Sequence, residues 1–170
     1  MSDSSSRLVP SEPIPSKPTL PDPQPAIAIA SDHAGFEQKN ALAEWLIAAG
    51  YPVTDFGPFD DSRVDYPDYA ALVGNAVANR QADLGILICG TGIGMAIAAN
   101  KVKGIRAAQM TTVEFATLAR EHNAANVATL SARYIDLDTN KEIINAFLAA
   151  SPLGERHADR VAKIGELEVL

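Results

Sequence analysis

Cysteine is almost absent from this chain of 170 residues, which contains only Cys89. A single cysteine cannot form an intramolecular disulfide, so its thiol is free for chemistry and nothing in the cysteine content indicates an oxidising compartment. Long hydrophobic runs are also lacking. The apolar runs have the length of a strand and end in Gly, Asp or Asn, well short of the roughly 20 residues that cross a bilayer. We therefore expect a cytoplasmic protein with no membrane partner.

Basic residues are in the minority, because 14 Lys and Arg stand against 21 Asp and Glu and give a net charge of −7. A protein whose main partner is nucleic acid or an anionic membrane needs a clustered positive field, so the charge argues against both partners. Metal-binding patterns are missing too, since none of the three histidines stands at ligand spacing with a carboxylate or the cysteine. We expect no metal and no cofactor, and any anionic ligand must be bound by local groups.

Proline is concentrated at the N-terminus, where residues 1–25 hold seven of the eleven prolines, with serines between them. This composition predicts a disordered, partly polyproline tail. The segment lacks the apolar core of a secretory signal, and with only Arg7 and Lys17 basic it is a poor transit peptide. We assign residues 1–25 to a Pro/Ser-rich tail and residues 26–170 to one domain, whose length suits a single hydrophobic core.

From residue 26 onward, short apolar runs alternate with amphipathic segments. The run LGILIC at 84–89 is apolar throughout, which predicts a strand buried on both faces in the middle of a sheet. Regular alternation of strands and helices predicts an α/β fold, a Rossmann-like three-layer sandwich with a parallel sheet of about five strands. The predicted strands are 26–30, 53–56, 84–89, 105–110 and 126–130, and the helices with predicted bounds are 93–100, 136–150 and 156–167.

Polar residues cluster at three places in this predicted fold. In doubly wound sheets, ligands bind beyond the carboxyl ends of the strands. The segment 31–35 (SDHAG) follows the first strand, 89–94 (CGTGIG) ends the third, and 121–123 (EHN) ends the fourth helix. We expect all three segments to face one crevice.

Cys89 is the strongest candidate for chemistry, because it ends a buried strand and Gly90, Gly92 and Gly94 follow it. The N–H groups of such a turn and of the next helix form a positive concavity, which favours a thiolate and can hold an oxyanion. An aldose–ketose interconversion needs both, because a base removes a carbon-bound proton beside a carbonyl and the enediolate must be stabilised. The alternative is that Cys89 is a small buried hydrophobic residue, the commoner role of a lone cysteine.

The other polar candidates each have a structural alternative. Asp32 suits a sugar hydroxyl and His33 a phosphate, yet Asp32 is equally suited to capping the next helix. His122 lies on the apolar side of its predicted helix, where the spacing alone favours a core histidine. Arg156 and Arg160 stand one turn apart near the start of the last helix and form a candidate phosphate fork, although surface arginines are common.

The glycine turn also raises nucleotide binding as a function without turnover. Gly90, Gly92 and Gly94 do not match G-x-G-x-x-G, because Met95 stands at the third glycine position, and no Gly-Lys follows for a P-loop. No acidic residue ends the fourth predicted strand, where a carboxylate for ribose would be expected. A nucleotide-binding module is therefore the second hypothesis.

Taken together, these motifs closely resemble the ribose-5-phosphate isomerase type B family, which also includes allose-6-phosphate and galactose-6-phosphate isomerases. The chain departs from the family pattern in its proline-rich tail and at 130–133 (LSAR), where relatives usually carry a glycine before the arginine. Some family members use a glutamate as the base, but this chain retains the cysteine. The resemblance covers about residues 26–168 and is carried, in order, by 31–35, 65–67, 85–94, 98–101, 104–107, 122–123, 126–127, 156–157 and 160–161.

The resemblance implies a role for each matched residue. Cys89 would be the base that moves a proton between C1 and C2, and His122 would open the furanose ring. The remaining residues would bind substrate: Gly90, Thr91, Gly92, Ile93 and Gly94 around the enediolate oxygens, with the Thr91 hydroxyl assisting; Asp32, Tyr66 and Asn123 at the sugar hydroxyls; and His33, Arg133, Arg156 and Arg160 at the phosphate.

The family also implies a substrate and an assembly. Ribose 5-phosphate and ribulose 5-phosphate are the leading pair, and a hexose 6-phosphate of the allose or galactose type is the alternative. Family members are dimers or tetramers in which two subunits line each site. We therefore expect a homodimer or homotetramer with shared sites.

Overall fold

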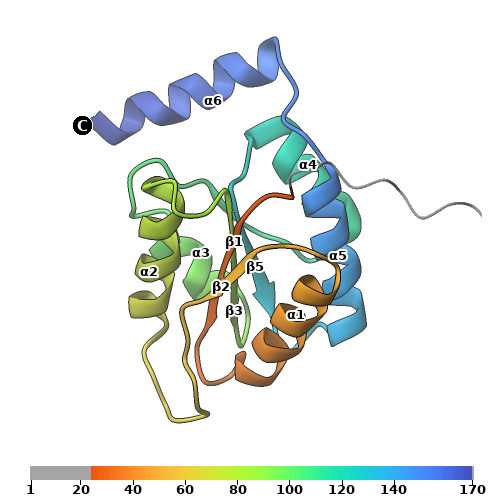
Figure 1. The fold of residues 1–170 in the computed structure, drawn as a ribbon. Helices are drawn as coiled ribbons and strands as arrows, with labels where there is room; N and C mark the ends of the chain where they lie inside the picture. The colour runs from red at the N-terminus through yellow and green to blue at the C-terminus, as the bar shows by residue number, and fades with distance from the viewer. Residues whose placement is uncertain (1–23, 170) are drawn as a thin grey trace, which may run out of the picture.

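The computed structural model describes residues 24–169, in which strands and helices alternate as the sequence predicts (Figure 1). The predicted disordered tail falls almost entirely on residues 1–23, which lie outside the described part. No helix of the described part has the length and apolar character needed to cross a membrane. In chain order the elements are β1 (Ile27–Ser31), α1 (Phe36–Ala48), β2 (Val53–Asp55), α2 (Tyr66–Ala78), β3 (Leu84–Cys89), α3 (Ile93–Ala99), β4 (Ala107–Gln109), α4 (Val113–Asn123), β5 (Val127–Ser131), α5 (Leu137–Ala149), α6 (Arg156–Glu166) and the short 3₁₀ helix η1 (Leu167–Val169).

The five strands form one parallel sheet with the order β2-β1-β3-β5-β4. β3 lies in the centre and all of its residues are buried, as the uninterrupted apolar run predicts. Helices α2 and α3 cover one face, and α1, α4 and α5 cover the other (Figure 1). The predicted Rossmann-like sandwich is therefore confirmed.

Side-chain alternation along β1 explains the two core layers. Ile27 and Ile29 point into the layer beneath α1 and α5, whereas Ala28 and Ala30 point into the layer beneath α2. Successive side chains of a strand face opposite sides of the sheet, so one strand supplies both layers. Small side chains on the α2 face leave room for that helix to pack closely.

The edge strand β4 is shorter than the predicted run 105–110. It covers only Ala107–Gln109, because the residues before it are held by turn and side-chain contacts. The Ile105 N–H donates to the Val102 carbonyl at 3.1 Å, and the Arg106 N–H donates to the Asn126 side-chain oxygen at 2.7 Å. An apolar run alone does not reveal such local competition for backbone hydrogen bonds.

Helix α6 lies across the amino-terminal edge of the sheet, at the top of Figure 1, and packs on α4. His157 is its only buried residue. The segment beyond it is fixed where the Gly104 N–H donates to the Glu168 carboxylate at 2.9 Å. Most of α6 is thus exposed in the isolated chain.

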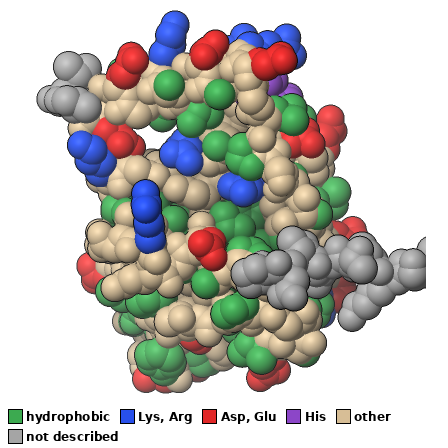
Figure 2. All heavy atoms as spheres, turned by 45° about the horizontal axis from the view of Figure 1, so that its top comes forward, with side chains coloured by type: hydrophobic (Ala, Val, Ile, Leu, Met, Phe, Trp, Pro, Cys, Tyr) green, Lys and Arg blue, Asp and Glu red, His purple; other side chains and the backbone are tan. Residues whose placement is uncertain are grey.

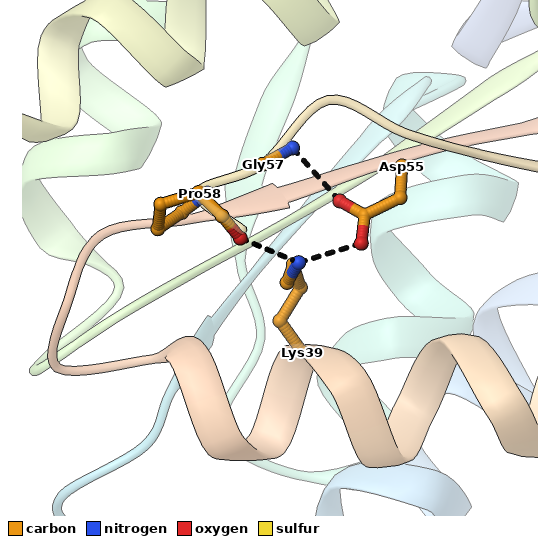
Figure 3. Close-up of polar contacts among 4 residues, drawn as sticks. All are labelled: Lys39, Asp55, Gly57 and Pro58. Atoms are coloured by element: carbon orange, nitrogen blue, oxygen red, sulfur yellow. Dashed lines mark hydrogen bonds and ion pairs between the residues drawn. The ribbon is translucent and has the colours of Figure 1, made fainter. Parts of the chain in front are cut away.

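A buried lysine joins α1 to the end of β2 (Figure 3). The Lys39 ammonium lies 2.6 Å from the Asp55 carboxylate and donates to the Pro58 carbonyl at 2.9 Å. The other Asp55 oxygen accepts the Gly57 N–H at 2.8 Å, and the rings of Phe36 and Phe59 lie 5.5 Å from the ammonium. These contacts hold the start of the loop between β2 and α2 against the sheet.

We predict that Lys39→Met lowers the free energy of unfolding by about 3 kcal/mol, because removing one partner of a buried ion pair leaves the other uncompensated. Asp55 keeps 28% of its side chain exposed, so water limits the loss. Denaturant unfolding measures it. Lys141→Met is the control, since Lys141 pairs with Asp138, whose side chain is 90% exposed. Equal losses in the two variants would contradict the prediction.

Candidate functional site

The parallel register brings three strand ends together at the carboxyl edge of the sheet. Ser31 stands beside Ile88, and Cys89 stands beside Ser131. Beyond the strands, the Asp32 N–H donates to the Ile88 carbonyl at 3.1 Å and the Ala132 N–H donates to the Cys89 carbonyl at 2.9 Å. The segments 31–35 and 89–94 therefore share one edge, as predicted.

Cys89 is 5% exposed and lies at the base of the glycine turn. Its Sγ accepts a hydrogen bond from the Gly92 N–H at 3.1 Å. A backbone donor aimed at the sulfur stabilises the thiolate, the form of cysteine that acts as a base or nucleophile. The sequence left open a purely structural role for Cys89, and this donor favours the chemical one.

Two glycines shape the turn and its contact with Tyr66. Gly92 has φ of +81°, and a Cβ there would also lie 3.0 Å from the Leu130 carbonyl carbon. At Gly94 a Cβ would lie 2.8 Å from the Tyr66 ring, so the missing side chain lets Tyr66 lie directly against the turn. Inside it, the Thr91 hydroxyl accepts the Ile93 N–H at 3.3 Å.

Arg133 also reaches the turn, although 130–133 departs from the family pattern. Its N–H donates to the Gly90 carbonyl at 3.1 Å, and a Cβ on Gly90 would lie 3.2 Å from the Arg133 Nε. The Ser131 hydroxyl donates to the same carbonyl at 2.9 Å. The segment thus places the Arg133 guanidinium against Gly90 without the glycine.

Asp32 is 8% exposed and does not cap α1 in the expected way. Its carboxylate accepts hydrogen bonds from the N–H groups of Ala34 and Gly35 at 2.9 and 3.0 Å. The N-cap residue of α1 is Gly35, so the helix has no side-chain cap. Asp32 instead closes the turn between β1 and α1. Next to it, the His33 Nδ1 lies 3.3 Å from the Val64 carbonyl, which fixes the loop that leads to Tyr66.

A cleft of about 440 Å³ opens beside the glycine turn. Its lining adds polar groups from the ends of β4 and β5 that the sequence analysis did not select. The rule that ligands bind at strand carboxyl ends could have indicated them, but their side chains carry no recognisable catalytic pattern. The cleft is lined by Thr91, Ile93, Gln109, Thr111, Ser131, Tyr134 and Ile135.

The expectation that 121–123 faces the same crevice is wrong within one chain. Helix α4 runs against the strand direction. Its last residues, His122 and Asn123, therefore lie close to the start of β5. Val127, the first residue of β5, stands beside Gly85, and Gly85 is four residue steps from Cys89 along β3, a length of about 13 Å. His122 therefore lies toward the amino-terminal edge of the sheet, whereas the glycine turn lies at the carboxyl edge.

His122 belongs to a cationic cluster at this second edge. Its ring stacks on that of His157, with centroids 4.3 Å apart and planes inclined by 16°, and the Arg156 Nε lies 3.4 Å from the His157 Nε2. Burial, together with the charges of His122, Arg156 and Arg160, lowers the pKa of His157. His122 is only half-buried, so it is not a core histidine.

Beneath the carboxyl-terminal end of α6 the surface is hollowed, and the lining there includes Ile164 and Leu167 but none of the cluster's residues. Figure 2 shows Lys and Arg side chains around a hollow beneath α6, which has a volume of about 460 Å³ and includes Lys101 and Lys103 in its lining. The two lysines would attract an anion such as phosphate, and the Glu168 carboxylate in the same lining would oppose it. Within residues 24–169 no three His, Cys, Asp or Glu side chains gather as metal ligands would. That the protein works without a metal stays a prediction.

Curated relatives align over most of this chain. The probable ribose-5-phosphate isomerase B of Mycoplasma genitalium is 47% identical over 140 residues, which cover 81% of this chain and 92% of that protein. Ribose-5-phosphate isomerase B of Escherichia coli is 44% identical over 142 residues, which cover 84% and 95%.

Solved structures agree with these relatives. The Clostridium thermocellum ribose-5-phosphate isomerase B superposes with a TM-score of 0.84 at 48% identity, covering 85% of this chain and 97% of that one. The Mycoplasma genitalium enzyme, solved with bound ribulose-5-phosphate, gives 0.81 at 46% identity, covering 85% and 96%. The family model described as ribose/galactose isomerase matches residues 27–164. By sequence and fold alike, the chain belongs to the ribose/galactose isomerase family.

Proposed function

We propose that this protein interconverts ribose 5-phosphate and ribulose 5-phosphate through an enediolate, with Cys89 as the base. The observation that carries the proposal is the Gly92 N–H aimed at the Cys89 sulfur inside the glycine turn, at 3.1 Å. It sets a candidate base among fixed backbone donors, which is the combination that enolisation needs. The names of the relatives, all ribose-5-phosphate isomerases among those described above, put the pentose before a hexose 6-phosphate.

The chemistry follows from this arrangement. The Cys89 thiolate takes the proton from C2 of the open-chain aldose, the C1–C2 double bond forms, and the carbonyl electrons move to O1. N–H groups of the turn hold the enediolate oxygens, and the Thr91 hydroxyl shuttles a proton between O1 and O2. The thiol then returns its proton to C1, which leaves the ketone at C2 and regenerates the thiolate.

Binding groups would come from two subunits. Asp32, His33, Tyr66 and Arg133 lie around the turn of one chain. The residues assigned to ring opening and to the other side of the phosphate, namely His122, Asn123, Arg156 and Arg160, lie at the opposite edge of the same chain. A second copy is needed to bring that cationic edge over the first turn.

The surface beside β4 supports such a dimer. β4 is a three-residue edge strand, and exposed edges are normally covered or blunted. Large apolar side chains flank it: Ile93 and Ile97 on α3 are 49% and 61% exposed, and Val113 and Phe115 on α4 are 43% and 55% exposed. A two-fold interface over this band would bury these side chains in both copies.

A panel of pentose and hexose phosphates, assayed with a chelator present, tests the proposal. We expect turnover of ribose 5-phosphate in both directions and slower or no turnover of allose and galactose 6-phosphates. Preference for a hexose phosphate would show that the substrate is a hexose 6-phosphate and not ribose 5-phosphate. Binding without any turnover would favour a module that lacks catalysis, and loss of activity with the chelator would contradict the metal-free mechanism. The cytoplasmic location expected from the sequence analysis is likewise a proposal.

We predict that Cys89→Ala reduces the isomerisation rate by at least about 100-fold, the scale of a lost general base, while binding of a phosphorylated sugar acid changes little. The thiolate moves the proton, whereas the phosphate is bound by other groups. Steady-state kinetics and calorimetric titration measure the two effects. Near-normal turnover in the variant would show that Cys89 is not the base.

We predict that two inactive variants restore activity to each other when mixed. In a mixed dimer of Cys89→Ser and His122→Ala, one shared site holds both defects and the other holds neither. Random exchange makes half of the dimers mixed, so about a quarter of the normal activity should return, by the symmetry of a two-fold interface. Specific activity is measured after reversible dissociation, and native mass spectrometry confirms exchange. Zero recovery in a confirmed mixture would rule out shared sites.

A further inference from the structure

Gln109 reaches from the end of β4 to the glycine turn. Its side-chain amide donates to the Thr91 carbonyl at 2.7 Å, and a Cβ on Gly92 would lie 3.4 Å from the Gln109 Cγ. The sequence analysis gave Gln109 no role. It is neither the proposed base nor one of the proposed substrate-binding residues. Its contact is with the backbone that forms the proposed oxyanion site.

The peptide group that Gln109 contacts also faces Cys89. The carbonyl of the Thr91–Gly92 peptide accepts from Gln109, and the N–H of the same peptide donates to the Cys89 Sγ at 3.1 Å. This peptide is trans, since Gly57–Pro58 is the cis bond of the described chain. In a trans peptide the carbonyl and the N–H point in opposite directions. Holding the carbonyl therefore aims the N–H at the sulfur.

We propose that Gln109 is a positioning residue that fixes the Thr91–Gly92 peptide and thereby stabilises the Cys89 thiolate. The catalytic meaning of this role rests on the proposed function, because it takes Cys89 as the base. Two hydrogen bonds in series also polarise the shared peptide, which strengthens the donor at the sulfur.

The turn needs such an anchor because Gly92 is permissive. Glycine occupies positive and negative φ with similar ease, so rotation of the peptide meets little resistance from Gly92 itself. A rotated peptide would turn the Thr91 carbonyl oxygen toward Cys89 and repel a thiolate. Gln109 is well placed to prevent this, since it stands beside Thr129 in the sheet and the next residue, Met110, donates to the Thr129 carbonyl at 3.0 Å.

Other titratable groups also stand at this edge of the sheet. Asp32 and His33 follow β1, Tyr66 begins α2, and Arg133 follows β5 and packs on Gly90. None of these side chains shares a hydrogen bond with Gln109 in the described chain. Replacing Gln109 by an uncharged residue leaves their charges in place, so a change in the Cys89 titration would report the peptide.

The test compares Gln109→Met with the normal protein, using the ultraviolet absorbance of the thiolate as a function of pH. Cys89 is the one cysteine of the chain, so Cys89→Ser supplies the blank. We expect Gln109→Met to form less Cys89 thiolate than the normal protein at a given pH, because the anion loses part of its stabilisation. In assays at neutral pH, kcat should fall several-fold while KM changes less than about twofold, since the phosphate contacts remain.

Thr111→Val is the matched control, because Thr111 lines the same cleft but makes no hydrogen bond to the turn in the described chain. It should titrate like the normal protein. Gln109→Leu repeats the test if the methionine variant folds poorly, and thermal unfolding checks both. A Cys89 thiolate fraction that is unchanged in the folded variants would overturn the inference. A lowered thiolate fraction with unaltered isomerisation would uphold the positioning role and instead count against Cys89 as the base.

Discussion

The parallel pairing of β1, β3 and β5 is the constraint on which the site depends. Parallel neighbours all end at one edge, and the register sets Ser31 beside Ile88 and Cys89 beside Ser131. The loops that follow therefore meet, which brings Asp32, Cys89 and Arg133 to the same edge of the sheet. A strand reversed in this sheet would carry its polar end to the other edge and break up the cluster.

The same constraint separates His122 from Cys89. In a parallel sheet each connecting helix must run back against the strands, so residues at the end of a helix lie at the amino-terminal edge. His122, His157 and Arg156 meet there through the packing of α6 on α4. A single chain thus holds the proposed base and its donor at one edge and the cationic groups at the other, and their separation is the physical reason for proposing a shared site.

Much of this was predictable because local sequence carries the strongest signals. The run at 84–89 could be placed mid-sheet since only a strand covered on both faces is apolar at every position. The glycines at 90, 92 and 94 marked the turn, and two of them are required by a positive φ or by the Tyr66 ring. Asp32 was placed at the right edge, but its bonds to Ala34 and Gly35 could not be distinguished in advance from a helix cap.

The sequence by itself determined the order of the elements, the buried central strand and the residue types at each strand end, because those depend on neighbours close in the chain. Only the tertiary structure decided which ends meet. Gln109 and Thr91 are bonded across 18 positions, and Lys39 and Asp55 across 16; neither pair has a local pattern that would reveal it. Contacts of this kind follow from the order of the strands and the packing of the helices, which no single segment encodes.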